Sequence, residues 1–102
     1  MDAQLKRGLL DMCVLKVLVK KDSYGYEIIS LLENTVKIAE ATLYPILKRL
    51  EKQGLVETYN IEYNSRLRKY YKITSEGVTR LESFKEDYKE LDKIYRFILE
   101  DK

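Results

Sequence analysis

The side chains best suited to chemistry in this sequence carry basic or hydroxyl groups, and they gather in two short segments. The first set, within residues 42–49, is Thr42, Tyr44, Lys48 and Arg49. The second set, within residues 66–72, is Arg66, Arg68, Lys69 and Lys72, interleaved with Tyr70 and Tyr71. Such groups bond phosphate oxygens, and arginine or lysine also bonds the edge of a guanine. Both segments therefore indicate the binding of a polyanion.

The composition gives little support to catalysis. The chain of 102 residues has no histidine, which is the commonest general base and metal ligand. One cysteine cannot form a zinc site, and the four glycines include no phosphate-binding loop. Carboxylates lie scattered among lysines, where such charges are usually solvated. We therefore expect neither an enzyme nor a bound metal or cofactor.

Charge is divided unevenly along the chain. The net charge of +2 is small, but residues 1–74 hold 13 Lys or Arg and 9 Asp or Glu, a net of +4. Residues 75–102 hold 6 Lys or Arg and 8 Asp or Glu, a net of −2. A basic body joined to a slightly acidic segment is compatible with one surface that faces a polyanion.

The apolar segments predict a cytoplasmic protein that does not enter a membrane. No apolar run approaches the roughly 20 residues that a bilayer requires, and no signal peptide is visible at the start. Cys13 lies in an apolar stretch and has no second cysteine with which to pair. A lone cysteine fits a reducing compartment, and a small buried side chain is expected, with a redox sensor as the alternative.

Three helices are predicted in the first half of the chain. Residues 5–20 are apolar almost all round, which is typical of a helix enclosed by neighbours. Residues 24–33 form a second, shorter helix, for which Asp22 or Ser23 is the expected N-cap. A third helix starts near residues 40–42, and its inner face consists of Leu43, Ile46, Leu47 and Leu50.

The pattern changes after Gly54, which is placed to cap the third helix in the left-handed conformation. Residues 55–63 and 68–73 are rich in Tyr, Val, Ile and Thr, which favour strands. Asn64 and Ser65 between them are expected to form the turn of a β-hairpin.

A last helix is expected from Thr74 or Ser75 to about residue 99. Three compact helices, a hairpin and a long helix are the layout of a winged helix-turn-helix. The predicted class is therefore mainly α with a two-stranded β-hairpin. Residues 1–74 would form the winged helix-turn-helix DNA-binding domain, and residues 75–102 a C-terminal dimerisation helix.

The last helix carries an apolar stripe whose members are spaced alternately three and four residues apart. They are Leu81, Phe84, Tyr88, Leu91, Tyr95 and Ile98. This heptad spacing is typical of a seam between two helices. Because a small domain cannot cover so long a stripe, we expect a homodimer, with folding of the stripe back onto its own domain as the alternative.

Three segments resemble the PadR family of bacterial transcription regulators. They read Tyr-Gly-Tyr-Glu-Ile at 24–28, Ala-Thr-Leu-Tyr-Pro-Ile-Leu-Lys-Arg-Leu-Glu at 41–51, and Arg-Lys-Tyr-Tyr-Lys-Ile-Thr at 68–74, followed by Gly77. The single last helix is similar to the small subfamily. The resemblance implies a homodimeric, sequence-specific regulator of double-stranded DNA, with a palindromic operator and a ligand-responsive repressor role. The alternative is a winged helix that binds proteins and not DNA.

The resemblance gives the two basic segments roles on DNA. A helix-turn-helix lays its third helix in the major groove, which would place Thr42 and Tyr44 at base edges and Lys48 and Arg49 on phosphates or a guanine edge. The hairpin would reach the DNA backbone or minor groove through Arg66, Arg68 and Lys69. Ser23 and Tyr24, before the second helix, would contact a phosphate.

The resemblance also implies a hydrophobic cavity at the dimer centre in some members. Tyr88 matches the aromatic residue that lines it, and Gly8, Met12 and Asp92 would lie nearby. A small hydrophobic or aromatic effector would bind there. The alternative is a packed interface without a cavity.

Overall fold

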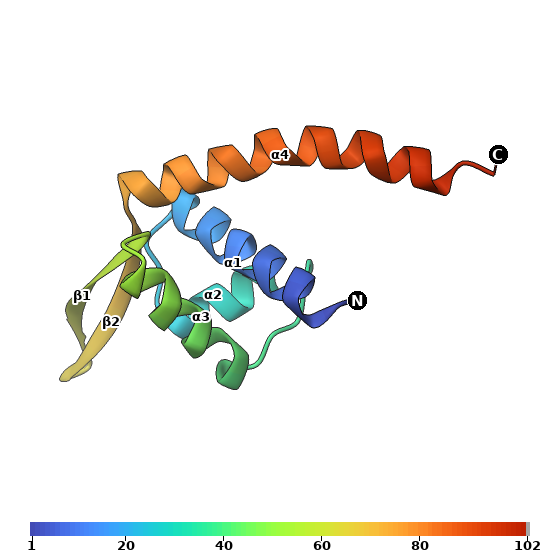
Figure 1. Cartoon of the computed structure of the whole chain (residues 1–102). Helices are drawn as coiled ribbons and strands as arrows, with labels where there is room; N and C mark the ends of the chain where they lie inside the picture. The colour runs from blue at the N-terminus through green and yellow to red at the C-terminus, as the bar shows by residue number, and fades with distance from the viewer. Residues whose placement is uncertain (102) are drawn as a thin grey trace.

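Three helices, a β-hairpin and a long helix follow one another along the chain in the predicted order (Figure 1). The computed structural model describes residues 1–101. Its elements are α1 (Ala3–Lys20), α2 (Gly25–Leu32), α3 (Glu40–Lys52), β1 (Val56–Tyr63), β2 (Arg66–Ile73) and α4 (Ser75–Leu99). The predicted fold class, a mainly helical winged helix-turn-helix, is confirmed.

Helix α1 lies at the centre of the molecule. It contacts α2, α3, β2 and α4, which explains why its sequence is apolar nearly all round. Val14 and Leu15 of α1 are fully covered, and they pack in one core with Ile28 of α2 and Leu43 of α3. The inner face predicted for α3 is confirmed, because all four of its apolar residues are buried.

Local capping chemistry sets several helix ends. Gly54 follows α3 with φ of 76°, the left-handed conformation predicted for it. Thr74 caps α4, since its hydroxyl accepts a hydrogen bond of 3.1 Å from the N–H of Gly77. The predicted cap of α2 is wrong, because the helix begins after Tyr24 and has no side-chain cap.

The hairpin turn lies where the sequence predicts it, but the second strand begins two residues earlier than predicted. Asn64 and Ser65 have φ of 51° and 64°, so the two of them alone form a turn of left-handed residues. A turn of this kind matches the twist of the flanking strands. Strand β2 therefore begins at Arg66, which pairs with Tyr63, and not at Arg68.

Helix α4 has two parts with different surroundings. Its first part packs on α1, where Leu81 is only 4% exposed. Most of the Leu81 side chain, predicted to face a partner, is therefore covered within its own protomer, and only its remaining exposed surface could meet a second copy. From Tyr88 onward the apolar stripe is exposed, and the helix extends beyond the rest of the fold (Figure 1).

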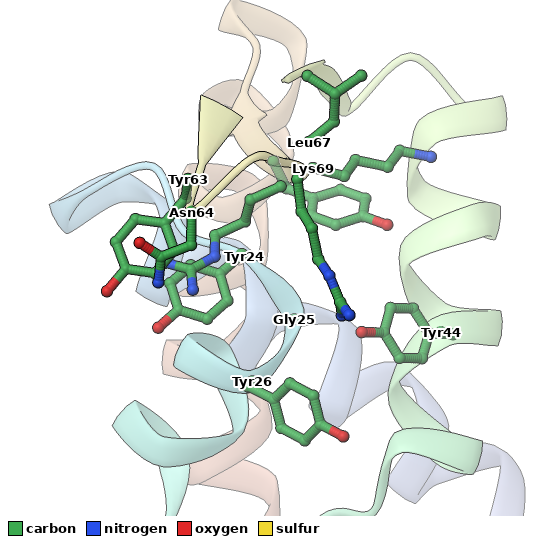
Figure 2. A pocket seen from close by; sticks show the side chains of 11 residues that line it. Tyr24, Gly25, Tyr26, Tyr44, Tyr63, Asn64, Leu67 and Lys69 are labelled. Carbon is green, nitrogen blue, oxygen red and sulfur yellow. The ribbon is translucent and has the colours of Figure 1, made fainter. Parts of the chain in front are cut away.

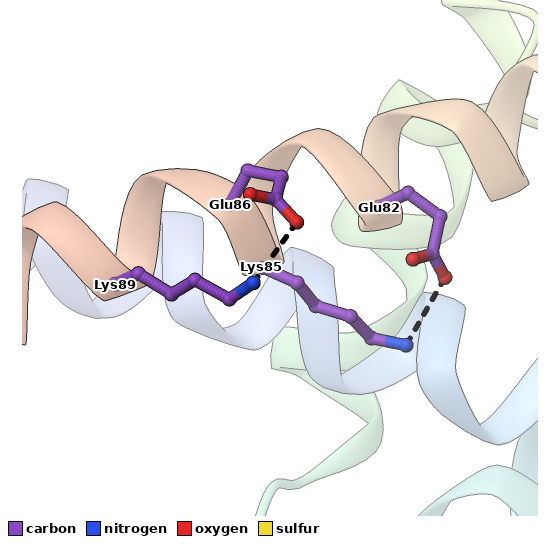
Figure 3. Close-up of polar contacts among 4 residues, drawn as sticks. All are labelled: Glu82, Lys85, Glu86 and Lys89. Carbon is purple, nitrogen blue, oxygen red and sulfur yellow. Dashed lines mark hydrogen bonds and ion pairs between the residues drawn. The ribbon is translucent and has the colours of Figure 1, made fainter.

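The polar side of α4 carries short-range ion pairs. Lys85 donates to Glu82 at 3.1 Å and Lys89 to Glu86 at 3.3 Å, each one turn apart (Figure 3). Exposed pairs of this kind stabilise a helix only slightly. They therefore indicate which face of α4 is solvated and contribute little to its stability. In the described residues, no helix is long and apolar enough to cross a membrane.

Two glycines give a stability test of this packing. A methyl group on Gly77 would overlap the carbonyl oxygen of Leu55 and come within 2.6 Å of Ile73 Cγ1. We expect Gly77→Ala to lower the free energy of unfolding by about 2 kcal/mol. Gly8 in α1 has nothing within 4 Å of such a methyl, so Gly8→Ala should raise it by about 0.5–1 kcal/mol. Urea unfolding followed by circular dichroism measures both, and a Gly77→Ala protein as stable as the wild type would contradict the packing.

Candidate nucleic-acid interface

A groove of about 530 Å³ lies between the start of α2, helix α3 and the hairpin (Figure 2). We call it the basic groove. Its lining residues are Tyr24, Gly25, Tyr26, Tyr44, Tyr63, Asn64, Arg66, Leu67, Arg68, Lys69 and Tyr71. Three cations and five phenol rings face it, and no carboxylate is among the lining residues. This surface suits a phosphate backbone, because hydroxyl and cationic groups bond phosphate oxygens.

Helix α3 supplies one wall of the basic groove through Tyr44. The phenol points from α3 toward α2 (Figure 2), and its ring lies close to Gly25, where an added methyl would come within 2.8 Å of the Tyr44 Cζ. Gly25 therefore leaves the space that Tyr44 occupies. Thr42 and Lys48, also predicted to contact DNA, are exposed on α3 but do not line the groove.

Arg49 lies elsewhere than the sequence predicts. Its guanidinium forms an ion pair with Asp11 of α1, and both side chains are partly buried. The pair joins helices whose residues are 38 positions apart in the chain. The expectation that Arg49 faces outward to DNA is corrected, because this contact turns it toward α1.

The three predicted residues of the hairpin all line the basic groove, in two different environments. Arg66 and Lys69 are exposed. Arg68 is half-buried, with its guanidinium carbon 4.1 Å from the ring centroid of Tyr24 and 4.0 Å from that of Tyr63. Tyr24 and Tyr63 lie beside each other at one side of the groove (Figure 2). Arg66 and Lys69 are therefore the cations most available to a polyanion.

Ser23 is not available to a phosphate. Its side chain is fully buried and donates a hydrogen bond of 3.0 Å to the carbonyl of Lys21. Its backbone exchanges two hydrogen bonds with Tyr71 of β2, at 3.1 and 2.8 Å. The predicted contact between Ser23 and DNA is corrected, because the residue serves to join α2 to the hairpin.

Sequence reasoning missed several residues of the groove. Tyr26, Tyr63 and Asn64 line it, and so does Leu67, which is 72% exposed. The signal for Tyr63 and Leu67 is their position next to the turn, in the strands beside Arg66 and Arg68. Because the strands pair up to the turn, the register brings both residues to the same end of the hairpin.

The predicted effector pocket is only partly assembled in one protomer. Gly8 and Met12 line a cavity of about 310 Å³ between α1 and α4, together with Arg80, Phe84 and Asp87. Tyr88 and Asp92 do not line it, and Asp92 accepts a hydrogen bond of 2.9 Å from Arg96. Of the four predicted residues, the protomer therefore brings two together.

A larger apolar groove of about 720 Å³ lies among α1, α2 and α4. Its apolar lining includes Met12, Cys13, Val17, Leu31, Leu81 and Phe84, and its cations are Lys16, Lys20, Lys21 and Lys85. Cys13 is only partly buried, although it packs against the core as predicted, and burial raises the pKa of its thiol. A raised pKa favours the thiol over the reactive thiolate. We call this surface the apolar groove.

The chain is a winged helix-turn-helix protein, as shown by the order of its helices, the exposed side of α3 and the basic groove beside it. The winged helix-turn-helix is a DNA-binding fold. Residues 14–83 match the Transcriptional regulator PadR-like family. The chain belongs to this family of transcriptional regulators. Family membership confirms the predicted resemblance, and it confirms that the chain is a regulator and not an enzyme.

Several relatives support this assignment over nearly the whole chain. A protein of Lysinibacillus sphaericus, described as uncharacterized, is 37% identical over 99 residues, which cover 92% of this chain and 91% of that protein. A PadR family transcriptional regulator from Eggerthella lenta is 36% identical with a TM-score of 0.86, covering 97% of this chain and 88% of that one. A transcriptional regulator from Clostridium thermocellum is 32% identical with a TM-score of 0.85, covering 98% and 99%.

The hydrogen bond between Tyr59 and Asp22 predicts an unusual titration. Tyr59 Oη donates to Asp22 Oδ2 at 2.6 Å, and this bond raises the pKa of Tyr59 to about 12. The pKa in the unfolded chain is about 10. Since the folded value is the higher one, the stabilisation from this bond is fully present below about pH 10 and is lost as the pH rises toward 12.

Absorbance of the phenolate measures this directly. Compared with the wild type, Tyr59→Phe should remove a phenol that ionises near pH 12, and Asp22→Asn should bring that ionisation closer to pH 10. If the wild-type minus Tyr59→Phe difference titrates near pH 10, the hydrogen bond does not exist in solution.

Proposed function

We propose that this chain is a cytoplasmic, homodimeric repressor that binds a palindromic operator in double-stranded DNA and releases it in response to a small hydrophobic or aromatic effector. The observation that carries the DNA-binding part is the basic groove, where Arg66 and Lys69 are exposed beside α3 and no carboxylate is present. A surface with cations and without carboxylates attracts a polyanion and does not attract a basic partner.

On DNA, α3 would lie in the major groove. Thr42 and Tyr44 at its start would meet base edges or phosphates, and Lys48, one turn later, would neutralise a phosphate. The hairpin would carry Arg66 and Lys69 to the adjacent backbone or minor groove. This arrangement uses the exposed side chains of both elements and leaves the buried ones to the core.

The second half of α4 supports the dimer. Seven large apolar side chains there are exposed, namely Tyr88, Leu91, Ile94, Tyr95, Phe97, Ile98 and Leu99. A monomer rarely exposes so continuous an apolar surface. The apolar groove of a second copy offers a matching surface, because its lysines complement Glu100 and Asp101 that follow α4. A two-fold dimer would place two recognition helices about 34 Å apart, which fits a palindrome.

Effector binding would act between the two copies. The cavity that contains Gly8 and Met12 opens beside α4, where a partner helix would bring further aromatic side chains such as Tyr88. The two protomers would have one spacing that permits DNA binding and another that does not. An effector changes the DNA affinity only if it binds these two arrangements with different affinities. The ion pair of Asp11 with Arg49 would transmit a shift of α1 to α3.

Salt dependence of binding tests the DNA contacts. With the DNA upstream of its own gene, Lys69→Gln should weaken binding and reduce the slope of log affinity against log salt by about 1.8, since a dimer loses two phosphate contacts at about 0.9 each. Lys89→Gln, which removes the same charge from the solvated face of α4, is the control and should leave the slope unchanged. Equal slopes for Lys69→Gln and the wild type would show that Lys69 contacts no phosphate, and a wild type that binds no duplex would favour a protein-binding winged helix.

Sedimentation tests the dimer with two neighbouring substitutions. Leu91→Gln places an amide in the exposed apolar stripe, and we expect it to weaken dimerisation by about tenfold or more, because a buried polar group loses its water without a partner. Glu90→Gln changes the adjacent residue to the same side chain and should sediment as the wild type does. A wild-type chain that stays monomeric at micromolar concentration would exclude the homodimer.

A further inference from the structure

The segment before α2 is joined to the hairpin at three consecutive residues. Asp22 accepts the 2.6 Å hydrogen bond from Tyr59, and Ser23 exchanges two backbone hydrogen bonds with Tyr71. The ring of Tyr24 meets the ring of Tyr70 edge to face, with centroids 5.5 Å apart and planes at 72°. Each of these contacts crosses between elements that are more than 35 positions apart in the chain.

Aromatic stacking extends these contacts along the hairpin. Tyr59 and Tyr70, opposite each other in the strand register, stack with centroids 5.6 Å apart and planes at 11°. Arg68 lies between Tyr24 and Tyr63, within about 4 Å of both ring centroids. We call the five residues Tyr24, Tyr59, Tyr63, Arg68 and Tyr70 the aromatic clamp.

The outer half of the hairpin has little else to hold it. Strand β1 is buried at Val56, but every residue from Tyr59 to Tyr63 is exposed. A two-stranded hairpin alone is only marginally stable in water. Contacts between its side chains and the start of α2 therefore hold the outer half of the hairpin, whereas the inner part of β1 contacts α3 directly.

We propose that Arg68 is a positioning residue: stacked between Tyr24 and Tyr63, it holds the hairpin against α2 and so fixes the width of the basic groove before DNA arrives. This inference rests on the proposed DNA-binding function. It changes the role of Arg68 from the predicted phosphate contact, which Arg66 and Lys69 are better exposed to make. A preformed groove strengthens binding because less motion is lost when the complex forms.

The chemistry of arginine suits this position. The guanidinium is flat and weakly hydrated, so it stacks on aromatic rings on both of its faces, whereas the ammonium of lysine is a compact and strongly hydrated charge. Arg68→Lys therefore keeps the charge and loses the double stack. If Arg68 contacts a phosphate, Arg68→Lys should retain that contact. If Arg68 positions the hairpin, Arg68→Lys should loosen it.

Motion of the hairpin in the free protein is the first test. In ¹⁵N relaxation measurements, the amides of residues 64–67 should have order parameters near about 0.85 in the wild type and below about 0.6 in Arg68→Lys. Tyr24→Leu should loosen the hairpin in the same way, and Tyr24→Phe, which keeps the ring, should not. A hairpin that stays rigid in both Arg68→Lys and Tyr24→Leu overturns the proposal.

DNA binding is the second test, and it separates this inference from the function on which it rests. We expect Arg68→Lys to bind the upstream DNA about tenfold more weakly, and Arg68→Gln to retain the wild-type salt slope. If Arg68→Gln lowers the slope as much as Lys69→Gln does, Arg68 is a phosphate contact and the proposal is wrong. If the wild type binds no duplex, the DNA-binding role fails, while the relaxation measurement still decides whether the clamp exists.

Discussion

The contact of α1 with α2, α3, β2 and α4 at once is the constraint on which the rest of this structure depends. One helix forms the core of the DNA-binding body, through Val14 and Leu15, and also the floor on which the first part of α4 lies. Its residues therefore have to satisfy two sets of neighbours at once. Because interiors are closely packed, a displacement of α1 on one side is felt on the other. The ion pair of Asp11 with Arg49 joins α1 directly to α3 and would be affected by such a displacement.

The exposed side chains form two distinct surfaces, one on the hairpin and α3 and the other on α4. The hairpin and α3 present cations and phenols around a groove whose lining contains no carboxylate, whereas α4 presents an apolar stripe on one side and paired charges on the other. The first surface attracts a polyanion, and the second favours a helix of similar character. The proposed contacts with DNA and with a second copy would thus use different surfaces and would not compete.

The order and type of the elements could be predicted from the sequence because their signals are local. Thr74 caps the helix that follows it, Gly54 ends the helix before it, and apolar spacing marks the faces. The roles of Ser23 and Arg49 could not be predicted in this way. Each depends on a partner far along the chain, Tyr71 in one case and Asp11 in the other, and such partners meet only after the core has formed.

The spacing of apolar residues along a helix also does not show which part of the molecule covers them. Leu81 and Leu91 occupy the same stripe of α4, yet Leu81 is covered by its own protomer and Leu91 is half exposed. The spacing is the same in the two cases, and the difference arises because α1 packs only on the first part of α4 and diverges from the rest (Figure 1). The placement of a neighbouring helix, and not the stripe itself, therefore decides which of its residues are covered within the protomer.

The aromatic clamp limits where an effector can act. If the hairpin, the start of α2 and α3 are held together as one body, the width of the basic groove within a protomer is not the quantity that changes. An effector of the proposed dimer would then have to alter either the separation of the two protomers or the attachment of this body to α1, and both changes would involve the surfaces beside Gly8 and Met12. A rigid hairpin would favour this mechanism, because a small shift in α1 would reach the DNA without being absorbed by motion of the hairpin.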